Sequence, residues 1–330
     1  MSKTAAAPTA AAGRSQTNWL GIANTALPLI ALVALVVYFA ARSSSFLTID
    51  NLTVMSGQAG PLLLAALGAT FVVTMGSIDL SVGSVALLCG AVAASVLAES
   101  SLGLWAIPIG LGLGILLGVA NGVVYAYGRV PSFITTLGSL SIFAGIGLLI
   151  LDGSPLPFIN PDFSELAIGQ IIPKVQNSGL WALIAWAVFV FVGFRTKFGL
   201  YIYAIGGDER VAELSGIRIN RYKVAAFALS GLTAAAAGLL SAGQLGSGGP
   251  TLGSSFLLDS LAAIVVGGTA LSGGTGGVHR TLLGVLLITI LANGLNQIGV
   301  DEFTQEIIKG GVIILAVAIT MVTRRGLVIK

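Results

Sequence analysis

Long runs of apolar residues, separated by short polar segments, dominate the chain. The runs Leu20–Ala41, Ser56–Ser77 and Leu102–Gly128 contain no charged residue. About 20 such residues are enough for a helix to cross a bilayer. We therefore predict an all-α polytopic membrane protein. Along the whole chain, the pattern indicates ten membrane-spanning helices, at about 20–41, 56–76, 81–98, 103–127, 132–151, 179–194, 223–243, 258–272, 281–298 and 306–323.

The composition excludes a soluble fold. Hydrophobic residues make up 55% of the chain and charged residues 9%, and its 45 glycines are about twice the usual share. So few charges cannot cover the surface of a water-soluble domain of this size. The single cysteine, Cys89, lies in an apolar run, and we interpret it as a small packing residue.

The two ends of the chain are more polar than its centre. The first nineteen residues are rich in Ala, Ser and Thr and place Lys3 and Arg14 before the first apolar run. That run is long for the core of a signal peptide, so we expect a retained span. The expected domains are a disordered cytoplasmic tail at 1–19, a transmembrane domain at 20–323 with a cytoplasmic loop at 195–222, and a cytoplasmic tail at 324–330.

The basic residues predict the orientation in the membrane. With both termini cytoplasmic, thirteen Lys and Arg residues lie inside and three outside, which is the bias that membrane proteins show. The outside residues are Arg42, Lys174 and Lys309. The excess of Lys and Arg over Asp and Glu thus reflects membrane topology, and we expect no nucleic-acid partner. The inside residues are Lys3, Arg14, Arg129, Arg195, Lys197, Arg210, Arg218, Arg221, Lys223, Arg280, Arg324, Arg325 and Lys330.

Short matches relate the two halves of the chain. "GSIDLSV" with Asp79 is followed by "ANG" with Asn121, and "FLLDSLA" with Asp259 is followed by "ANG" with Asn293. The predicted topology places the first pair inside and the second outside. This arrangement indicates an inverted repeat of spans 2–5 and 7–10, which is common among transporters. Chance similarity between glycine-rich spans is the alternative.

Small residues recur at every fourth position of the fourth predicted span. One helical face therefore carries almost no side-chain bulk, and another helix can approach it closely. The partner is either a helix of the same chain or a second subunit. The residues of this face are Ala106, Gly110, Gly114, Gly118, Gly122 and Ala126.

The sequence lacks the usual catalytic motifs. It contains no GxxxxGK[ST] phosphate loop, no HExxH, no paired-cysteine motif and no GxSxG. We interpret His279 as a loop histidine beside a glycine-rich turn, and Asp79 and Asp259 as helix caps. We therefore predict that the chain is not an enzyme, with no catalytic, cofactor-binding or metal-binding residues.

One charged segment interrupts the apolar pattern at 204–222. Asp208 is a good N-cap and Gly216 a good helix terminator, which predicts a helix at 209–215. Two turns are marginally stable alone. The segment therefore either docks on a partner, inserting Val211, Leu214 and Ile217, or lies as a solvated helix at the membrane surface.

Several stretches resemble one family. In order, they cover most of residues 50–323, and the chain is identified as similar to the permease subunits of bacterial ATP-binding-cassette importers, in the ribose and simple-sugar branch of the branched-chain amino acid and ribose permease superfamily. The matching stretches are "GSIDLSVGSV" (76–85), "NGVVYAYGRVPSFITTLG" (121–138), "FGLYIYAIGGDERVAELSGIRINRYK" (198–223), "SGGPTLGSSFLLDSLAAIVVGGTALSGGTGG" (247–277) and "NGLNQIGVDEFTQEIIKGGVIILAVAI" (293–319).

The resemblance implies that the charged segment is a coupling helix, which fits a groove on a separate ATPase subunit. The family pattern there is Glu-Ala-Ala-x-x-x-Gly. Ala212 and Gly216 match it, whereas Arg210 replaces the usual Glu and puts a Glu-specific contact in doubt. The implied coupling residues are Gly207, Asp208, Glu209, Arg210, Val211, Ala212, Glu213, Leu214, Ser215, Gly216 and Ile217.

The resemblance also implies an assembly in the bacterial inner membrane. Two permease chains, identical or different, would sit in lipid with ABC ATPase subunits that use the ATP, and with an extracytoplasmic sugar-binding protein. The expected cargo is a monosaccharide, a ribose-like pentose or a hexose. Polyols, nucleosides and branched-chain amino acids are alternative cargoes, and an ATP-independent secondary carrier or facilitator is the alternative class.

The fifth predicted span carries the first candidates for a translocation path. Its hydroxyl and aromatic residues are spaced by four, three and four positions, and so share one helical face. Hydroxyl bonds within or between helices are the alternative role. The path candidates are Ser132, Thr136, Ser139 and Phe143, with Asn293 and Asn296 as further polar residues.

Overall fold

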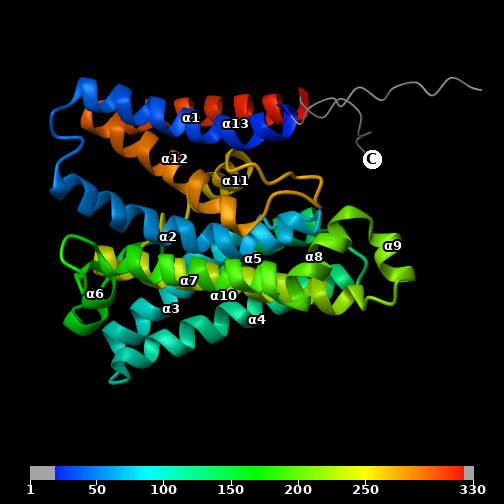
Figure 1. Ribbon diagram of the computed structural model, residues 1–330. Coiled ribbons are helices and arrows are strands. Elements are labelled where there is room, and N and C mark those ends of the chain that lie inside the picture. Colours follow the sequence, from blue (N-terminus) through cyan, green and yellow to red (C-terminus); the bar gives the residue numbers. More distant parts are fainter. Residues whose placement is uncertain (1–18, 323–330) are drawn as a thin grey trace, which may run out of the picture.

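The computed structural model describes residues 19–322, almost all of them in helices that lie side by side (Figure 1). The predicted tail at 324–330, and the predicted tail at 1–19 except for residue 19, lie outside the described residues. A 3₁₀ turn η1 (Gly103–Trp105) precedes α4, and a short antiparallel pair joins β1 (Leu156–Pro157) to β2 (Ser247–Gly248). The helices are α1 Trp19–Arg42, α2 Ile49–Thr74, α3 Val82–Glu99, α4 Ala106–Ala126, α5 Ser132–Ile150, α6 Pro161–Ile168, α7 Asn177–Arg195, α8 Lys197–Gly207, α9 Glu209–Leu214, α10 Ile219–Leu245, α11 Phe256–Val266, α12 Val278–Gln297 and α13 Glu302–Val322.

The all-α polytopic fold is confirmed. Seven of the described helices, α2, α3, α4 with its 3₁₀ turn, α5, α7, α10 and α12, are long and apolar enough to cross a membrane. The other three predicted spans correspond to α1, α11 and α13. Helix α11 has only 11 residues and ends at Val266, short of the expected 272, because the chain turns at Gly267 and Gly268, whose φ is +96°. The total of ten spans stays a prediction.

Helices α2 and α10 form the centre of the molecule. They pack against each other, α10 also contacts α3 and α4, and α2 also contacts α7 and α12. Their facing side chains supply much of the largest apolar cluster, including Leu67 and Phe71 from α2 and Phe227 and Ala234 from α10. In Figure 1 the two helices run along the middle of the bundle.

The glycine face of α4 lies against α10 of the same chain. A β carbon at Gly114 or Gly118 would collide with the α10 backbone, at Gly231 and Phe227 respectively. The close approach works from both sides, because Gly231 in turn faces the backbone of Gly114 and Gly118. The face therefore serves packing within one chain.

Helix pairings in the two halves correspond. Helix α10 packs on α4 and α3 as α2 packs on α12 and α11, and α3 contacts α5 as α11 contacts α13. If α2–α5 is superposed on α10–α13, each of these helix contacts falls on its counterpart in the other half. An inverted repeat requires this correspondence. Asn293 bonds to Asn51 in the first turn of α2, whereas Asp79 follows its last turn. About 39 Å of helix separates these positions, since α2 has 26 residues.

Candidate functional site

Helix α9 projects from one end of the bundle, opposite the end that carries α6 (Figure 1). It spans Glu209–Leu214, close to the expected 209–215. The Asp208 carboxylate accepts hydrogen bonds from the backbone N–H groups of Arg210 at 2.9 Å and Val211 at 3.1 Å. Gly216, with φ +81°, ends the turn in the left-handed region. Local interactions thus fix both ends of α9.

The two sides of α9 differ. Val211 and Leu214 are 58% and 83% exposed, whereas Ala212 is buried against the bundle. Ile217 also packs against the main apolar cluster, and its N–H donates to the Ala212 carbonyl. Ile217 therefore contacts its own chain while it also lines the adjoining surface depression, and its insertion into a partner stays a prediction. Val211 and Leu214 are left as the apolar tip.

An ion pair ties α9 to the bundle. The Lys223 ammonium group lies 2.7 Å from Glu209 Oε1 and 4.4 Å from the ring centroid of Tyr125 on α4. Lys223 is only 8% exposed, so the pair is held in place by packing. Opposite charges at 209 and 223 are the one signal for this contact along the chain, since their spacing follows no helical rule across the break at 215–218.

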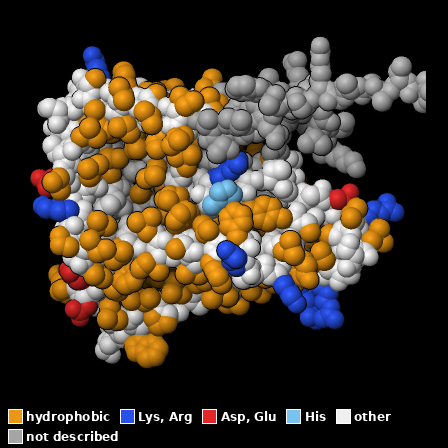
Figure 2. Space-filling model, viewed as in Figure 1, with side chains coloured by type: hydrophobic (Ala, Val, Ile, Leu, Met, Phe, Trp, Pro, Cys, Tyr) orange, Lys and Arg blue, Asp and Glu red, His pale blue; other side chains and the backbone are white. Residues whose placement is uncertain are grey.

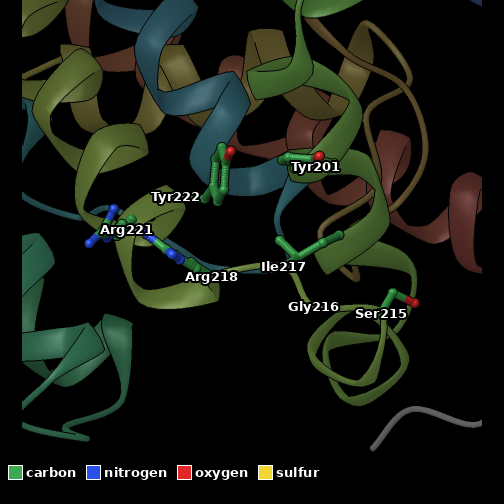
Figure 3. Close-up of a pocket in the computed structure, with 7 residues that line it drawn as sticks. All are labelled: Tyr201, Ser215, Gly216, Ile217, Arg218, Arg221 and Tyr222. Carbon is green, nitrogen blue, oxygen red and sulfur yellow. The ribbon is translucent and has the colours of Figure 1, made fainter.

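A shallow depression of about 440 Å³ adjoins α9 (Figure 3). Tyr201 of α8 and Tyr222 of α10 meet there edge to face, with ring centroids 5.0 Å apart. The side chains of Arg218 and Arg221 lie on its other side (Figure 3). An aromatic floor beside two guanidinium groups is suited to contact with a protein surface that carries acidic residues. No local pattern in the sequence indicates this depression.

The polar residues of α5 face the interior of the bundle. Ser132 Oγ accepts from the Ile78 N–H at 3.2 Å, and Ser139 donates to the Asn121 side-chain oxygen. Thr136 is fully buried and donates to the Ser132 carbonyl at 2.9 Å, and Phe143 is also buried. These residues share a face, as predicted, and in this conformation their hydroxyls fasten α5. Their place in a translocation path stays a prediction.

The asparagine candidates lie far from those of α5. Asn293 exchanges two side-chain hydrogen bonds with Asn51, at 2.9 and 3.1 Å, and Gln297 donates to the same Asn51 oxygen. Asn296, three positions further along α12, is exposed. The structure therefore divides the path candidates between the two ends of α2, and Asn293 holds α12 to α2.

Two carboxylates and the histidine have contacts beyond those expected from the sequence. Asp259 lies in the first turn of α11 and pairs with Lys309 Nζ at 3.6 Å instead of capping the helix. Asp79 lies before the α3 N-cap and accepts hydrogen bonds from Ser81 and Ser230. His279 is in the first turn of α12, partly buried, with its ring 4.9 Å from that of Phe194. In each case tertiary packing supplies a partner that the sequence did not indicate.

The molecular surface agrees with a membrane environment. Hydrophobic side chains cover much of the face shown in Figure 2, and basic side chains gather near α9. Helix α5 illustrates the pattern, since Phe133, Leu137 and Leu149 are all more than half exposed. An exposed apolar face of this extent is stable in lipid and not in water. The chain is a multi-pass membrane protein.

Comparison with known proteins gives a consistent result. Residues 51–317 match the family model described as the branched-chain amino acid transport system permease component. The chain is 39% identical to the ribose import permease protein RbsC of Escherichia coli, over 88% of this chain and 92% of the relative. It is 36% identical to the galactose/methyl galactoside import permease protein MglC of Salmonella typhimurium, over 93% and 96%. It is also 36% identical to the probable ABC transporter permease protein YphD of Escherichia coli, over 90% of each chain. No solved structure matches the chain.

Proposed function

We propose that this chain, which belongs to the branched-chain amino acid transport system permease family, is the membrane-spanning subunit of an ATP-driven importer for a monosaccharide. The family match runs from α2 to α13 and so includes α9 and both halves of the repeat. Relatives covered over nearly their whole length are named as import permeases for ribose and for galactose. The resemblance inferred from the sequence motifs is thereby confirmed at the level of the family.

The geometry of α9 carries the proposal. A six-residue helix is too short to be stable by itself, yet this one is capped, anchored by Lys223 and left with an exposed apolar tip. Such an element is suited to dock in a groove on a separate ATPase subunit. In this assignment the ATPase binds and hydrolyses ATP, and the permease performs no covalent chemistry and needs no cofactor of its own.

The remaining parts of the assembly follow from the same assignment. A second permease chain completes the pathway, and an extracytoplasmic binding protein delivers the sugar at the α6 end. The α9 end faces the cytoplasm of a bacterial inner membrane, with both chain termini on that side. The excess of Lys and Arg in the segments at the α9 end supports this orientation.

A pentose or hexose is the cargo that the relatives' names favour. In this proposal the polar face of α5, with Ser132 and Ser139, becomes exposed to the sugar when the helices move apart. Hydroxyl groups can exchange their bonds within the bundle for bonds to a sugar at little net cost. A weakly held cargo is what a transport path needs, because the sugar must also leave.

Uptake measurements in the native host test the proposal. Deleting the gene should abolish uptake of labelled ribose or galactose, and ATP depletion should abolish it in the wild type. An affinity-tagged chain should copurify with an ABC ATPase whose hydrolysis drives sugar uptake in liposomes when a binding protein is present. Uptake that survives ATP depletion, in a chain that binds no ATPase, would identify a secondary carrier instead. Uptake of a polyol, a nucleoside or a branched-chain amino acid in place of the sugars would correct the cargo.

A further inference from the structure

The short turn between α2 and α3, residues 75–81, contacts more of the helices around it than its length suggests. We call it the α2–α3 turn. Ser77 Oγ donates to the Tyr125 hydroxyl of α4 at 2.8 Å, and the Ile78 N–H donates to Ser132 of α5 at 3.2 Å. Its Asp79 accepts a hydrogen bond from Ser230 of α10 at 2.7 Å. One turn thus holds α4, α5 and α10 together.

One side of this turn connects to α9 through Lys223. Glu209, the first residue of α9, bonds to Lys223, and Lys223 lies over the Tyr125 ring. The hydroxyl of the same tyrosine accepts the bond from Ser77 in the turn. A continuous series of short contacts therefore runs from Glu209 to the α2–α3 turn, and each link except Glu209 lies mostly inside the protein.

The other side of the turn connects to α5 through a buried polar network. Asp79 is 4% exposed and accepts from the Ser81 hydroxyl at 2.6 Å, and that hydroxyl accepts from Asn121 at 2.9 Å. Asn121 in turn accepts from Ser139 of α5. A buried carboxylate is costly unless its bonds are well made, and side-chain networks of this kind behave as a unit.

Helices α5 and α9 pack on different neighbours. Among the described helices, α5 packs mainly on α3 and α4, whereas α9 packs on α8 and α10. A displacement of α9 therefore has to cross an intermediate element before it reaches α5. The α2–α3 turn has hydrogen bonds on both sides of that gap.

We propose that the α2–α3 turn is the joint that carries a displacement of α9 to α5, with Lys223 and Asp79 as its positioning residues. The inference rests on the proposed function, in which an ATPase moves α9 and α5 borders the sugar path. Lys223 links α9 to the turn through Tyr125, and Asp79 fixes the turn to α10 through Ser230. The hydrogen bonds of Ser132 and Ser139 then draw α5 along with it.

Two substitutions separate this role from simple packing. Ser230→Ala removes the bond from α10 to Asp79, and Lys223→Met keeps the side-chain length while removing the bond to Glu209. The matched control is Thr233→Val, one turn further along α10. Thr233 is also buried, and its hydroxyl accepts from the Gly68 N–H in the body of α2 instead of the turn.

The assay uses the full permease and ATPase complex in liposomes and measures sugar imported per ATP hydrolysed. A Gly138→Cys reporter on the exposed side of α5, where no atom would lie within 4 Å of the new β carbon, measures the response of that helix to ATP by its rate of thiol labelling. The natural Cys89 is fully buried and should not react.

We expect Ser230→Ala and Lys223→Met to retain ATPase binding but to lose at least tenfold in sugar per ATP, with the ATP response of the reporter falling at least threefold. Thr233→Val should behave as wild type. The proposed role of the turn would be refuted if both variants imported sugar per ATP within twofold of wild type. An equal loss in Thr233→Val would refute it as well. If Lys223→Met does not fold, as judged by gel filtration, Ser230→Ala decides alone. Failure of the wild-type chain to bind an ATPase would refute the proposed function itself, and with it the joint.

Discussion

Replacing Gly216 by valine tests whether backbone conformation sets the end of α9. Gly216 has φ +81°, and no atom lies within 4 Å of the place where a β carbon would stand. Contact between the new β carbon and neighbouring atoms therefore contributes nothing to the effect. The cost is that of holding an L residue in the left-handed region, about 1–2 kcal/mol and more for a β-branched side chain.

This conformational cost weakens binding of the permease to the ATPase by the same free energy. Because roughly 1.4 kcal/mol corresponds to a tenfold change, the population of the docking-competent α9 should fall about 5- to 30-fold, and the apparent affinity by the same factor. Titration of detergent-solubilised permease with the isolated ATPase, followed by biolayer interferometry, measures the change. Gel filtration should show that the variant still inserts and folds.

Two matched variants complete this experiment. Gly112→Ala lies in helical backbone on α4, also in open space and away from α9, and should bind within twofold of wild type. Gly216→Asn should keep most of the affinity, because asparagine tolerates the left-handed region. The reasoning is refuted if Gly216→Val binds within twofold of wild type, or if Gly112→Ala weakens binding equally.

Three further predictions concern stability and charge. Gly118→Val should lower the free energy of unfolding by about 1–3 kcal/mol, because its side chain would collide with the α10 backbone. Gly112→Val, on the open side of α4, should change the stability little, and equal melting temperatures for the two variants would contradict the packing. Lys309→Met should lower the free energy of unfolding by about 3 kcal/mol, because it leaves Asp259 without this ion pair in a mostly buried site. Adding Asp259→Asn should restore part of the loss, and no recovery in the double variant would argue against the ion pair. Arg210→Glu changes an exposed charge on α9 and should alter the salt dependence of ATPase binding without changing permease stability, and an unaltered salt dependence would place Arg210 outside the interface.

Local sequence was sufficient to predict α9 and the long helices. Apolar runs of membrane-spanning length gave the helix positions, because burial in lipid constrains every residue of a span. Asp208 and Gly216 marked the ends of α9, because a cap bond and a left-handed glycine involve only residues a few positions apart. The family resemblance followed from the same short motifs.

Contacts between distant segments could not be predicted in this way. The hydroxyls of α5 were assigned to one face correctly, but periodicity does not say whether that face meets a path or another helix. Likewise, the sequence showed Asn293 as a polar residue near a span end, while only the packing of α12 on α2 gives it Asn51 as its partner. Helical periodicity determines which residues share a face, and tertiary packing decides what that face contacts.

The sequence by itself thus determined a membrane-embedded all-α chain with a short capped helix between two spans. The tertiary structure alone decided that Ile217 packs partly against the apolar core, that Glu209 bonds to Lys223, and that Asp79 joins α10 to the turn before α3. The physical reason is distance along the chain. Glu209 and Lys223 are separated by 14 positions and Asp79 and Ser230 by 151, and no local pattern specifies a contact across such separations.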